Sequence, residues 1–198
     1  MTKVKVLIEG YAREEENYQI ASSTTTLIRD KNLNIIVDPG MDRELLLNAL
    51  KKEKLSVNDI NYIILSHYHP DHFLLAGIFE KAKIIDNDSI YSFNGRIEEH
   101  NGIVPGTSIK IIPTPGHQSS HCSVLVNDDK LGKVVIAADV FWWWDNEQKK
   151  IDNKSLMKRK DPYAENEEEL INSREKVFEI ADYIIPGHGR MFKVDKKK

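Results

Sequence analysis

One segment, residues 66–72 (SHYHPDH), restricts what this chain can fold into more than any other part of its sequence. The apolar run 62–65 comes directly before it and predicts a strand. Side chains at positions i and i+2 of an extended chain point the same way, so His67 and His69 can bind one cation together. The fold must therefore end a strand where a metal ion can reach both imidazoles.

The same segment offers a second half-site. Pro70 fixes its own φ and favours extended backbone at His69, which stiffens the turn. Asp71 and His72 then stand at the start of a predicted helix and present an oxygen and a nitrogen to a second cation. Two cations this close together need an anion between them and more ligands than these four side chains supply.

Further residues of ligand type stand where the sequence predicts strand ends or tight turns, and they are His117, Asp139 and His188. Side chains that emerge from strand ends onto one rim are held by rigid structure behind them. A histidine in a turn is an ordinary feature by itself, and a solvated histidine-rich loop is the alternative interpretation of residues 66–72. It is the complete set that predicts a metal centre.

The rest of the pattern mixes hairpins with helical crossovers. Residues 1–9 predict a first strand, residues 24–29 and 34–38 a hairpin, and residues 43–52 a helix. Further strands are predicted over residues 83–86, 108–112, 122–126, 133–138 and 183–185, and further helices over residues 73–81 and from residue 165 onward. Two packed sheets with helices outside suit this order.

Length and composition narrow the class of protein. The 198 residues fit one domain, 1–198, and no apolar run approaches the roughly 20 residues that a membrane helix requires. A net charge of −3 gives no general attraction to nucleic acid, so such binding would need a local patch. The first residues lack the features of a secretion signal, so we expect a cytoplasmic protein. The single cysteine, Cys122, cannot form a disulfide within the chain, which agrees with a reducing compartment, and we expect an inert core thiol.

With these residues in this order, the sequence resembles the metallo-β-lactamase superfamily over nearly its whole length. Within it, residues 139–141 and 182–194 resemble the small proteins called metallo-β-lactamase domain-containing protein one. The resemblance implies an α/β fold, namely a four-layer αββα sandwich of two mixed β-sheets with helices on the outer faces. Residues 142–144, which are three tryptophans, and the basic stretch 149–160 depart from the family pattern.

The resemblance also assigns roles to the site residues. It implies that the first metal takes the residues that match His67, His69 and His117, and that the second takes those that match Asp71, His72 and His188. Asp139 is expected to bridge both metals, and Asp38 is expected to support the ligands without binding metal itself. True β-lactamases are usually exported and commonly lack the bridging aspartate, so the likeness argues against antibiotic hydrolysis as the main task. Glyoxalase II enzymes carry an added helical domain and the large nucleases an inserted one, and neither is expected here.

The hypothesis for the chemistry is a hydrolase with two zinc ions, iron and manganese being alternatives, and with no other cofactor. A water held between two cations would be ionised near neutral pH and would attack carbon or phosphorus. Asp71 is the predicted catalytic proton acceptor besides being a ligand.

Two substrate classes remain open, and the partners depend on them. The lysines and Arg159 within residues 149–160 lie shortly after the tryptophans, which suits a phosphodiesterase or ribonuclease acting on single-stranded RNA. For the lysines alone, a solvated loop is the stronger explanation. The alternative is a small thioester, ester or lactone, with weak β-lactamase activity as a side reaction, in a pocket lined by Tyr68 and the tryptophans. A non-catalytic metal-binding module is the third class. No membrane partner is expected, and a homodimer is left open.

Overall fold

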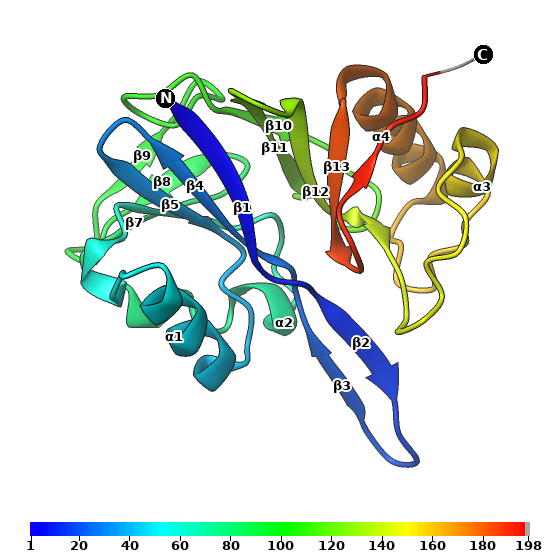
Figure 1. Cartoon of the computed structure of the whole chain (residues 1–198), viewed down its shortest axis with the longest axis horizontal. Coiled ribbons are helices and arrows are strands. Elements are labelled where there is room, and N and C mark those ends of the chain that lie inside the picture. Colours follow the sequence, from blue (N-terminus) through cyan, green and yellow to red (C-terminus); the bar gives the residue numbers. More distant parts are fainter. Residues whose placement is uncertain (197–198) are drawn as a thin grey trace.

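A computed structural model describes residues 1–196, so the last two residues of the expected domain lie outside the described part. Two sheets lie face to face with helices on both outer sides (Figure 1), which confirms the four-layer αββα fold. The first sheet has the strand order β1-β4-β5-β6-β7-β8-β9, and the second has the order β10-β11-β12-β13-β14.

The strands of the first sheet are β1 Thr2–Ile8, β4 Thr25–Asp30, β5 Leu33–Val37, β6 Tyr62–Ile64, β7 Lys83–Ile85, β8 Ser89–Tyr91 and β9 Ile97–Glu99. Those of the second sheet are β10 Lys110–Pro113, β11 Cys122–Asp128, β12 Gly132–Trp142, β13 Tyr183–His188 and β14 Phe192–Lys193. Pairs β5–β6, β6–β7 and β12–β13 are parallel and the other pairs are antiparallel, so both sheets are mixed.

Three apolar layers hold the sandwich together. Between the sheets, residues such as Ile35 of β5 and Val124 of β11 form a fully buried core. Leu46 and Leu50 of α1 (Arg43–Lys52) pack with Ile36 on the outer face of the first sheet. A corresponding layer joins α4 (Glu167–Ile180) to the outer face of the second sheet. The predicted alternation of strand and helix thus leads to burial of both faces of each sheet.

The sequence signals for α1 and for the hairpin are confirmed. The carboxylate of Asp42 accepts a hydrogen bond from Leu45 N at the start of α1, and Lys51 and Lys52 occupy its last turn, where cations stabilise the carboxyl end. β4 and β5 pair antiparallel around a two-residue turn in which Lys31 has a φ of 54°.

The predicted helix over residues 73–81 is wrong. The chain forms only α2 (Pro70–Phe73) and a short 3₁₀ turn, Ala76–Ile78. Gly77 weakens a helix at this point, and the irregular backbone allows Phe79 to be buried against the first sheet. Tertiary packing therefore overrides the local apolar pattern.

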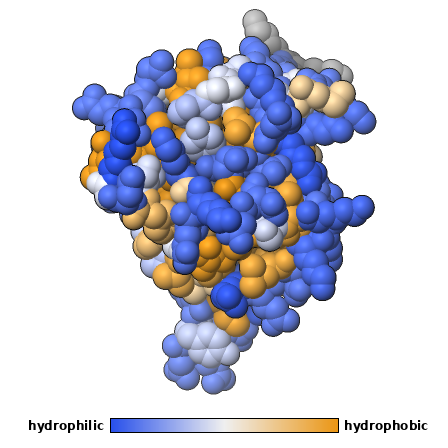
Figure 2. All heavy atoms as spheres, turned by 90° about the vertical axis from the view of Figure 1, so that its left-hand side faces the viewer, coloured by the Kyte–Doolittle hydropathy of each residue, from blue (hydrophilic) through white to orange (hydrophobic). Residues whose placement is uncertain are grey.

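Several elements had no clear signal in the sequence. A hairpin of β2 (Tyr11–Glu14) and β3 (Gln19–Ser22) projects from the body of the molecule at the bottom of Figure 1. A 3₁₀ turn, Val57–Asp59, follows α1, and a short helix, α3 (Asn153–Met157), interrupts the basic stretch. Seen from the left-hand side of Figure 1, the molecule is largely hydrophilic with hydrophobic patches between (Figure 2).

Two expectations from composition can be compared with the structure. Within residues 1–196, no helix combines the length and the apolar character that a bilayer crossing would need. Cys122 is a free, fully buried thiol, and burial raises its pKa well above the usual value, so it is uncharged and unreactive.

Candidate metal centre

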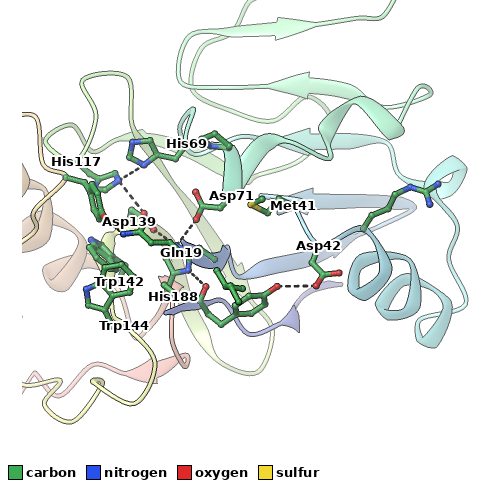
Figure 3. Close-up of a pocket in the computed structure, with 17 residues that line it drawn as sticks. Gln19, Met41, Asp42, His69, Asp71, His117, Asp139, Trp142, Trp144 and His188 are labelled. Carbon is green, nitrogen blue, oxygen red and sulfur yellow. Dashed lines mark hydrogen bonds and ion pairs between the residues drawn. The ribbon is translucent and has the colours of Figure 1, made fainter. Parts of the chain in front are cut away.

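The seven side chains predicted as metal ligands come together on one rim between the two sheets. They form two groups in which all ligand atoms lie within 4.8 Å of one another, the first being His67, His69, His117 and Asp139 and the second being Asp71, His72 and His188. Figure 3 shows His69, Asp71, His117, Asp139 and His188 turned toward a common centre. The ligand role of each remains a prediction, but their convergence is a property of the fold.

Local backbone geometry explains how each residue reaches the rim. His67 and His69 follow β6, and Asp71 and His72 lie in α2. His117 lies in the loop after β10, while Asp139 and His188 lie in the neighbouring parallel strands β12 and β13. The ligands thus come from both sheets, and the interface between the sheets fixes their spacing.

Three ring nitrogens meet in the first group. His69 Nδ1 lies 3.1 Å from His67 Nε2 and 3.0 Å from His117 Nε2. Neutral imidazoles cannot satisfy three mutually facing nitrogens with hydrogen bonds, because each ring has only one N–H to donate. Asp139 Oδ2 adds an oxygen 3.3 Å from His117 Nε2. Such an arrangement favours a cation at its centre.

The second group surrounds the other oxygen of the same carboxylate. His72 Nε2 lies 3.2 Å from Asp139 Oδ1, and His188 Nε2 lies 3.1 Å from Asp71 Oδ2. Asp139 therefore turns one oxygen to each group. This is the geometry expected of a carboxylate that bridges two cations.

Unsatisfied polar atoms provide a test of whether cations fit. His72 Nε2 and Asp139 Oδ1 are buried and lie 3.2 Å apart, yet they are not aligned for a hydrogen bond with each other, and neither makes one with another atom of the described structure. Tetrahedral ligands about 2.1 Å from a cation lie roughly 3.4 Å apart, close to the separations of the ligand atoms in both groups. A mixture of imidazole nitrogens and carboxylate oxygens suits zinc, and also iron or manganese. The residues present therefore fit divalent cations.

A buried carboxylate fixes the orientation of His72, as predicted for Asp38. Asp38 Oδ2 lies 2.8 Å from His72 Nδ1 and accepts a 2.6 Å hydrogen bond from Ser66 Oγ, while Oδ1 accepts one from Ser66 N. With Nδ1 bonded to Asp38, the Nε2 atom of His72 is directed at the centre. Outer contacts of this kind set the tautomer and the ring orientation of a ligand histidine.

Asp161 orients His117 in the same way, and no sequence pattern predicted this contact. Its Oδ2 lies 2.7 Å from His117 Nδ1, and its side chain is 1% exposed. Since 44 residues separate the two along the chain, no local spacing could have revealed the contact. On the other side of the centre, His188 Nδ1 bonds to the backbone carbonyl of Tyr11 at 3.0 Å.

Neighbouring imidazoles keep the two carboxylates of the centre ionised. Burial by itself would raise the pKa of Asp139, but the imidazoles of His72 and His188 outweigh it and hold that pKa well below its usual value. Burial opposes ionisation of Asp71 too, yet His188 and His72 lower its pKa. Both carboxylates are therefore anionic at neutral pH, as cation ligands must be.

Close approach of the backbone is needed beside Asp139. A Cβ atom at Gly187 would lie 1.7 Å from Asp139 Oδ1, so only glycine allows β13 to pass the carboxylate. Ala138 has a φ of 45°, an unfavourable conformation for alanine, where the register of β12 and β13 shifts. This irregular backbone directly precedes Asp139, whose two carboxylate oxygens face the two ligand groups.

His121 lies directly behind the centre without being one of the predicted ligands. Its ring is fully buried, with its centroid 5.0 Å from that of His67, and its Nδ1 lies 2.9 Å from Thr114 Oγ1. Burial lowers its pKa to about 3, so the ring is neutral at physiological pH.

A cavity of about 660 Å³ opens above the centre, and we call it the metal cavity. Its walls include Ile20 of the β2–β3 hairpin, Met41, Trp142 and Trp144, and its one basic lining residue is Arg43. In Figure 3 the two tryptophans lie on one side and Met41 on the other. The wall is therefore mainly apolar.

Tyr68 was expected in this wall, and that expectation is wrong. It lies between His67 and His69 in extended chain, so its side chain points away from the metal cavity, and its hydroxyl donates a hydrogen bond to Asp86. Tyr11 and Tyr163 line the metal cavity instead, and Tyr163 is linked to Gln19 of the hairpin by a 3.1 Å hydrogen bond.

Comparisons with known proteins agree with this geometry. Residues 20–92 match the family model described as the metallo-β-lactamase superfamily. Metallo-β-lactamase domain-containing protein 1 of Xenopus laevis is 32% identical over 98% of this chain and 82% of its own length. A Methanocaldococcus jannaschii protein named a probable metallo-hydrolase is 31% identical over 93% of this chain and 86% of its own length. Among solved structures, a metallo-β-lactamase candidate from Thermotoga maritima has a TM-score of 0.74 at 20% identity, covering 97% of this chain and 99% of its own.

Proposed function

The chain belongs to the metallo-β-lactamase superfamily and is a metal-dependent hydrolase, and from that premise we propose that it hydrolyses esters, thioesters or lactones that carry an apolar group. The apolar wall of the metal cavity is the observation that carries this proposal. Met41, Trp142 and Trp144 offer an alkyl or acyl chain a place to be buried directly beside the ligand residues. Apart from the metal ligands and the cations that they would hold, a phosphate would meet only Arg43 as a cationic partner among the described lining residues.

We propose two zinc ions as the cofactors. His67, His69 and His117 would hold the first, Asp71, His72 and His188 the second, and Asp139 both. Bound cations would supply Lewis-acid chemistry, lowering the pKa of water and accepting negative charge from the carbonyl oxygen.

The remaining steps belong to the side chains of the cavity. Asp71 is an ionised, partly buried carboxylate on the rim, so it can accept a proton from the attacking water and pass it to the leaving group. The hydroxyl of Tyr163 accepts a hydrogen bond from Gln19 Nε2, so it can donate its own O–H to a polar substrate end. The tryptophans and Met41 exclude bulk water from the bound chain.

A side-by-side assay tests the proposal. The purified chain, loaded with zinc, is given a 4-nitrophenyl ester series of increasing acyl length, an acyl thioester, a lactone, a phosphodiester and single-stranded RNA. We expect two zinc ions per chain by mass spectrometry and a kcat/KM that rises with acyl length. A rate that is independent of acyl length, or absent for every carbonyl substrate, would contradict the proposal.

A ribonuclease is the second candidate function, and the basic residues beside the tryptophans favour it. Lysines and aromatic faces together suit a single strand of nucleic acid. Cleavage of single-stranded RNA that falls steeply with salt concentration, and that exceeds carbonyl hydrolysis, would support this alternative.

A further inference from the structure

A second cavity adjoins the metal cavity and is not explained by the reaction described so far. It measures about 560 Å³ and shares Trp142 and Trp144 with the metal cavity. We call it the basic cavity, because its lining includes the cationic residues Lys149, Lys150, Arg159 and Lys160.

The positive charge of the basic cavity is mostly uncompensated. Glu147 is the one acidic lining residue, and its carboxylate is paired with Arg159 Nη2 at 3.2 Å. In residues 1–196, no carboxylate lies within 4.0 Å of the amino groups of Lys149, Lys150 or Lys160, all of which are exposed. Three cations around one hollow repel each other, so an anion bound among them is favoured.

Arg159 is held in place by the protein before any ligand arrives. Its Nε donates a 2.7 Å hydrogen bond to Trp142 O, and its guanidinium lies over the Trp143 ring, 5.2 Å from the centroid. Its own carbonyl accepts a hydrogen bond from the buried side chain of Arg174. A fixed guanidinium loses little entropy on binding an oxyanion.

Trp142 and Trp144 connect the two cavities. The ring of Trp142 lies 6.2 Å from that of the predicted ligand His188 and 5.2 Å from that of Trp144, centroid to centroid. A substrate whose reacting bond lies in the metal cavity can therefore extend past these rings into the basic cavity.

We propose that the basic cavity binds a phosphate group of the substrate, on the part of the molecule that is not cleaved. This inference rests on the proposed function and adds to it that the substrate is phosphorylated. A phosphate dianion matches one guanidinium and several ammonium groups better than a single carboxylate does. Two sources supply such a group: a phosphorylated small molecule and the backbone of a single-stranded nucleic acid.

Tryptophan fluorescence gives a direct binding test that requires no turnover. All three tryptophans of the chain line the basic cavity, so their emission reports its occupancy. The probes are 4′-phosphopantetheine, pantetheine, which differs from it only in lacking the phosphate, and a ten-nucleotide single-stranded RNA. We expect phosphopantetheine to bind about tenfold more tightly than pantetheine.

Charge-matched variants locate the binding. Lys150→Ala with Lys160→Ala removes two lining lysines, while Lys154→Ala with Lys158→Ala removes two exposed lysines of the same stretch that do not line the cavity. The first pair is expected to abolish the tenfold preference and the second to leave it within twofold. Equal losses in both pairs would overturn the inference, because general charge would then explain the binding.

The remaining outcomes distinguish the two sources of the phosphate group, and they distinguish a failure of this inference from a failure of the proposed function. RNA binding that only the first pair weakens identifies a nucleic-acid backbone as the source, and phosphopantetheine binding alone identifies a small molecule. If neither phosphorylated probe binds better than pantetheine, the inference fails. The acyl thioesters of phosphopantetheine and of pantetheine are then assayed for hydrolysis. If phosphopantetheine binds more tightly than pantetheine but neither thioester is cleaved, the proposed carbonyl hydrolysis fails and the phosphate site stands.

Discussion

Two regions line the metal cavity, and they are built differently. The ligand rim consists of residues that follow β6 and β10, of Asp139 within β12 and of His188 at the end of β13. Buried hydrogen bonds such as that between Asp38 and His72 hold it. The second region begins at Trp142 and continues through the connecting segment, residues 143–166, whose one helix is the short α3.

The connecting segment depends on contacts with distant parts of the chain. Asp145 N donates to Ala12 O in the hairpin, Asp161 bonds to His117, and Asn166 N donates to Gly116 O. The connecting segment therefore does two things: Asp161 supports the ligand rim at His117, while Trp144 and Tyr163 line the metal cavity. We expect the chemistry to depend on the ligand rim and the choice of substrate to depend on the wall residues of the connecting segment.

The largest expected effect comes from the rim. Asp139→Ala removes the one carboxylate that faces both groups of ligand atoms, so we expect bound zinc to fall and kcat/KM to drop by at least about a thousandfold. Asp88→Ala, which removes an exposed aspartate elsewhere, is the control and should keep the wild-type rate. Full activity of the Asp139 variant would show that the rim is not the reaction centre.

The next variant tests whether the connecting segment supports the rim. Asp161→Ala leaves His117 Nδ1 without its partner, so we expect zinc affinity to fall about 10- to 100-fold, measured by competition with a chelator. Glu165→Ala alters the same segment but removes only a hydrogen bond to Ser119 N, and should change the affinity less than threefold. Equal effects would mean that the segment acts through its fold and not through Asp161.

A smaller effect is expected from the wall itself. Trp144→Ala removes an apolar face from the metal cavity, and we expect kcat/KM for a long-chain ester to fall about tenfold, or ~1.4 kcal/mol. The shortest ester should lose less, since it reaches less of the wall. Zinc content should be unchanged, and a parallel loss of zinc would contradict the division between the two regions.

The smallest effect on catalysis is expected behind the rim, where the predicted change is one of stability. His121 has a pKa of about 3 when folded and about 6.5 when unfolded, so the unfolded chain gains a proton first as pH falls. The wild type should therefore lose at most about 1.4 kcal/mol of stability per pH unit between pH 6.5 and 3 through His121. The His121→Asn variant should lack this contribution. Urea unfolding of the metal-free variant and wild type at pH 7, 6 and 5 measures it, and identical slopes would exclude a neutral buried imidazole.

The sequence predicted the regular elements best where burial and periodicity agree. The bounds of α1 and the β4–β5 hairpin follow from local capping and turn residues. Two predictions failed for one reason, namely that contacts with other elements outweigh the local sequence pattern. These are the helix expected over residues 73–81 and the β2–β3 hairpin that was not expected. Local propensity is a weak guide wherever packing competes with it.

The sequence by itself determined which residues gather at the metal centre, since His67, His69, Asp71 and His72 lie within one short segment and the remaining ligands end predicted strands. Spacing along a strand fixes side-chain direction, so that information is local. Only the tertiary structure decided that Asp161 supports His117, that Tyr68 points away, and that Trp142 separates an apolar cavity from a basic one. These contacts join segments far apart in the chain, and their geometry exists only once both sheets have packed.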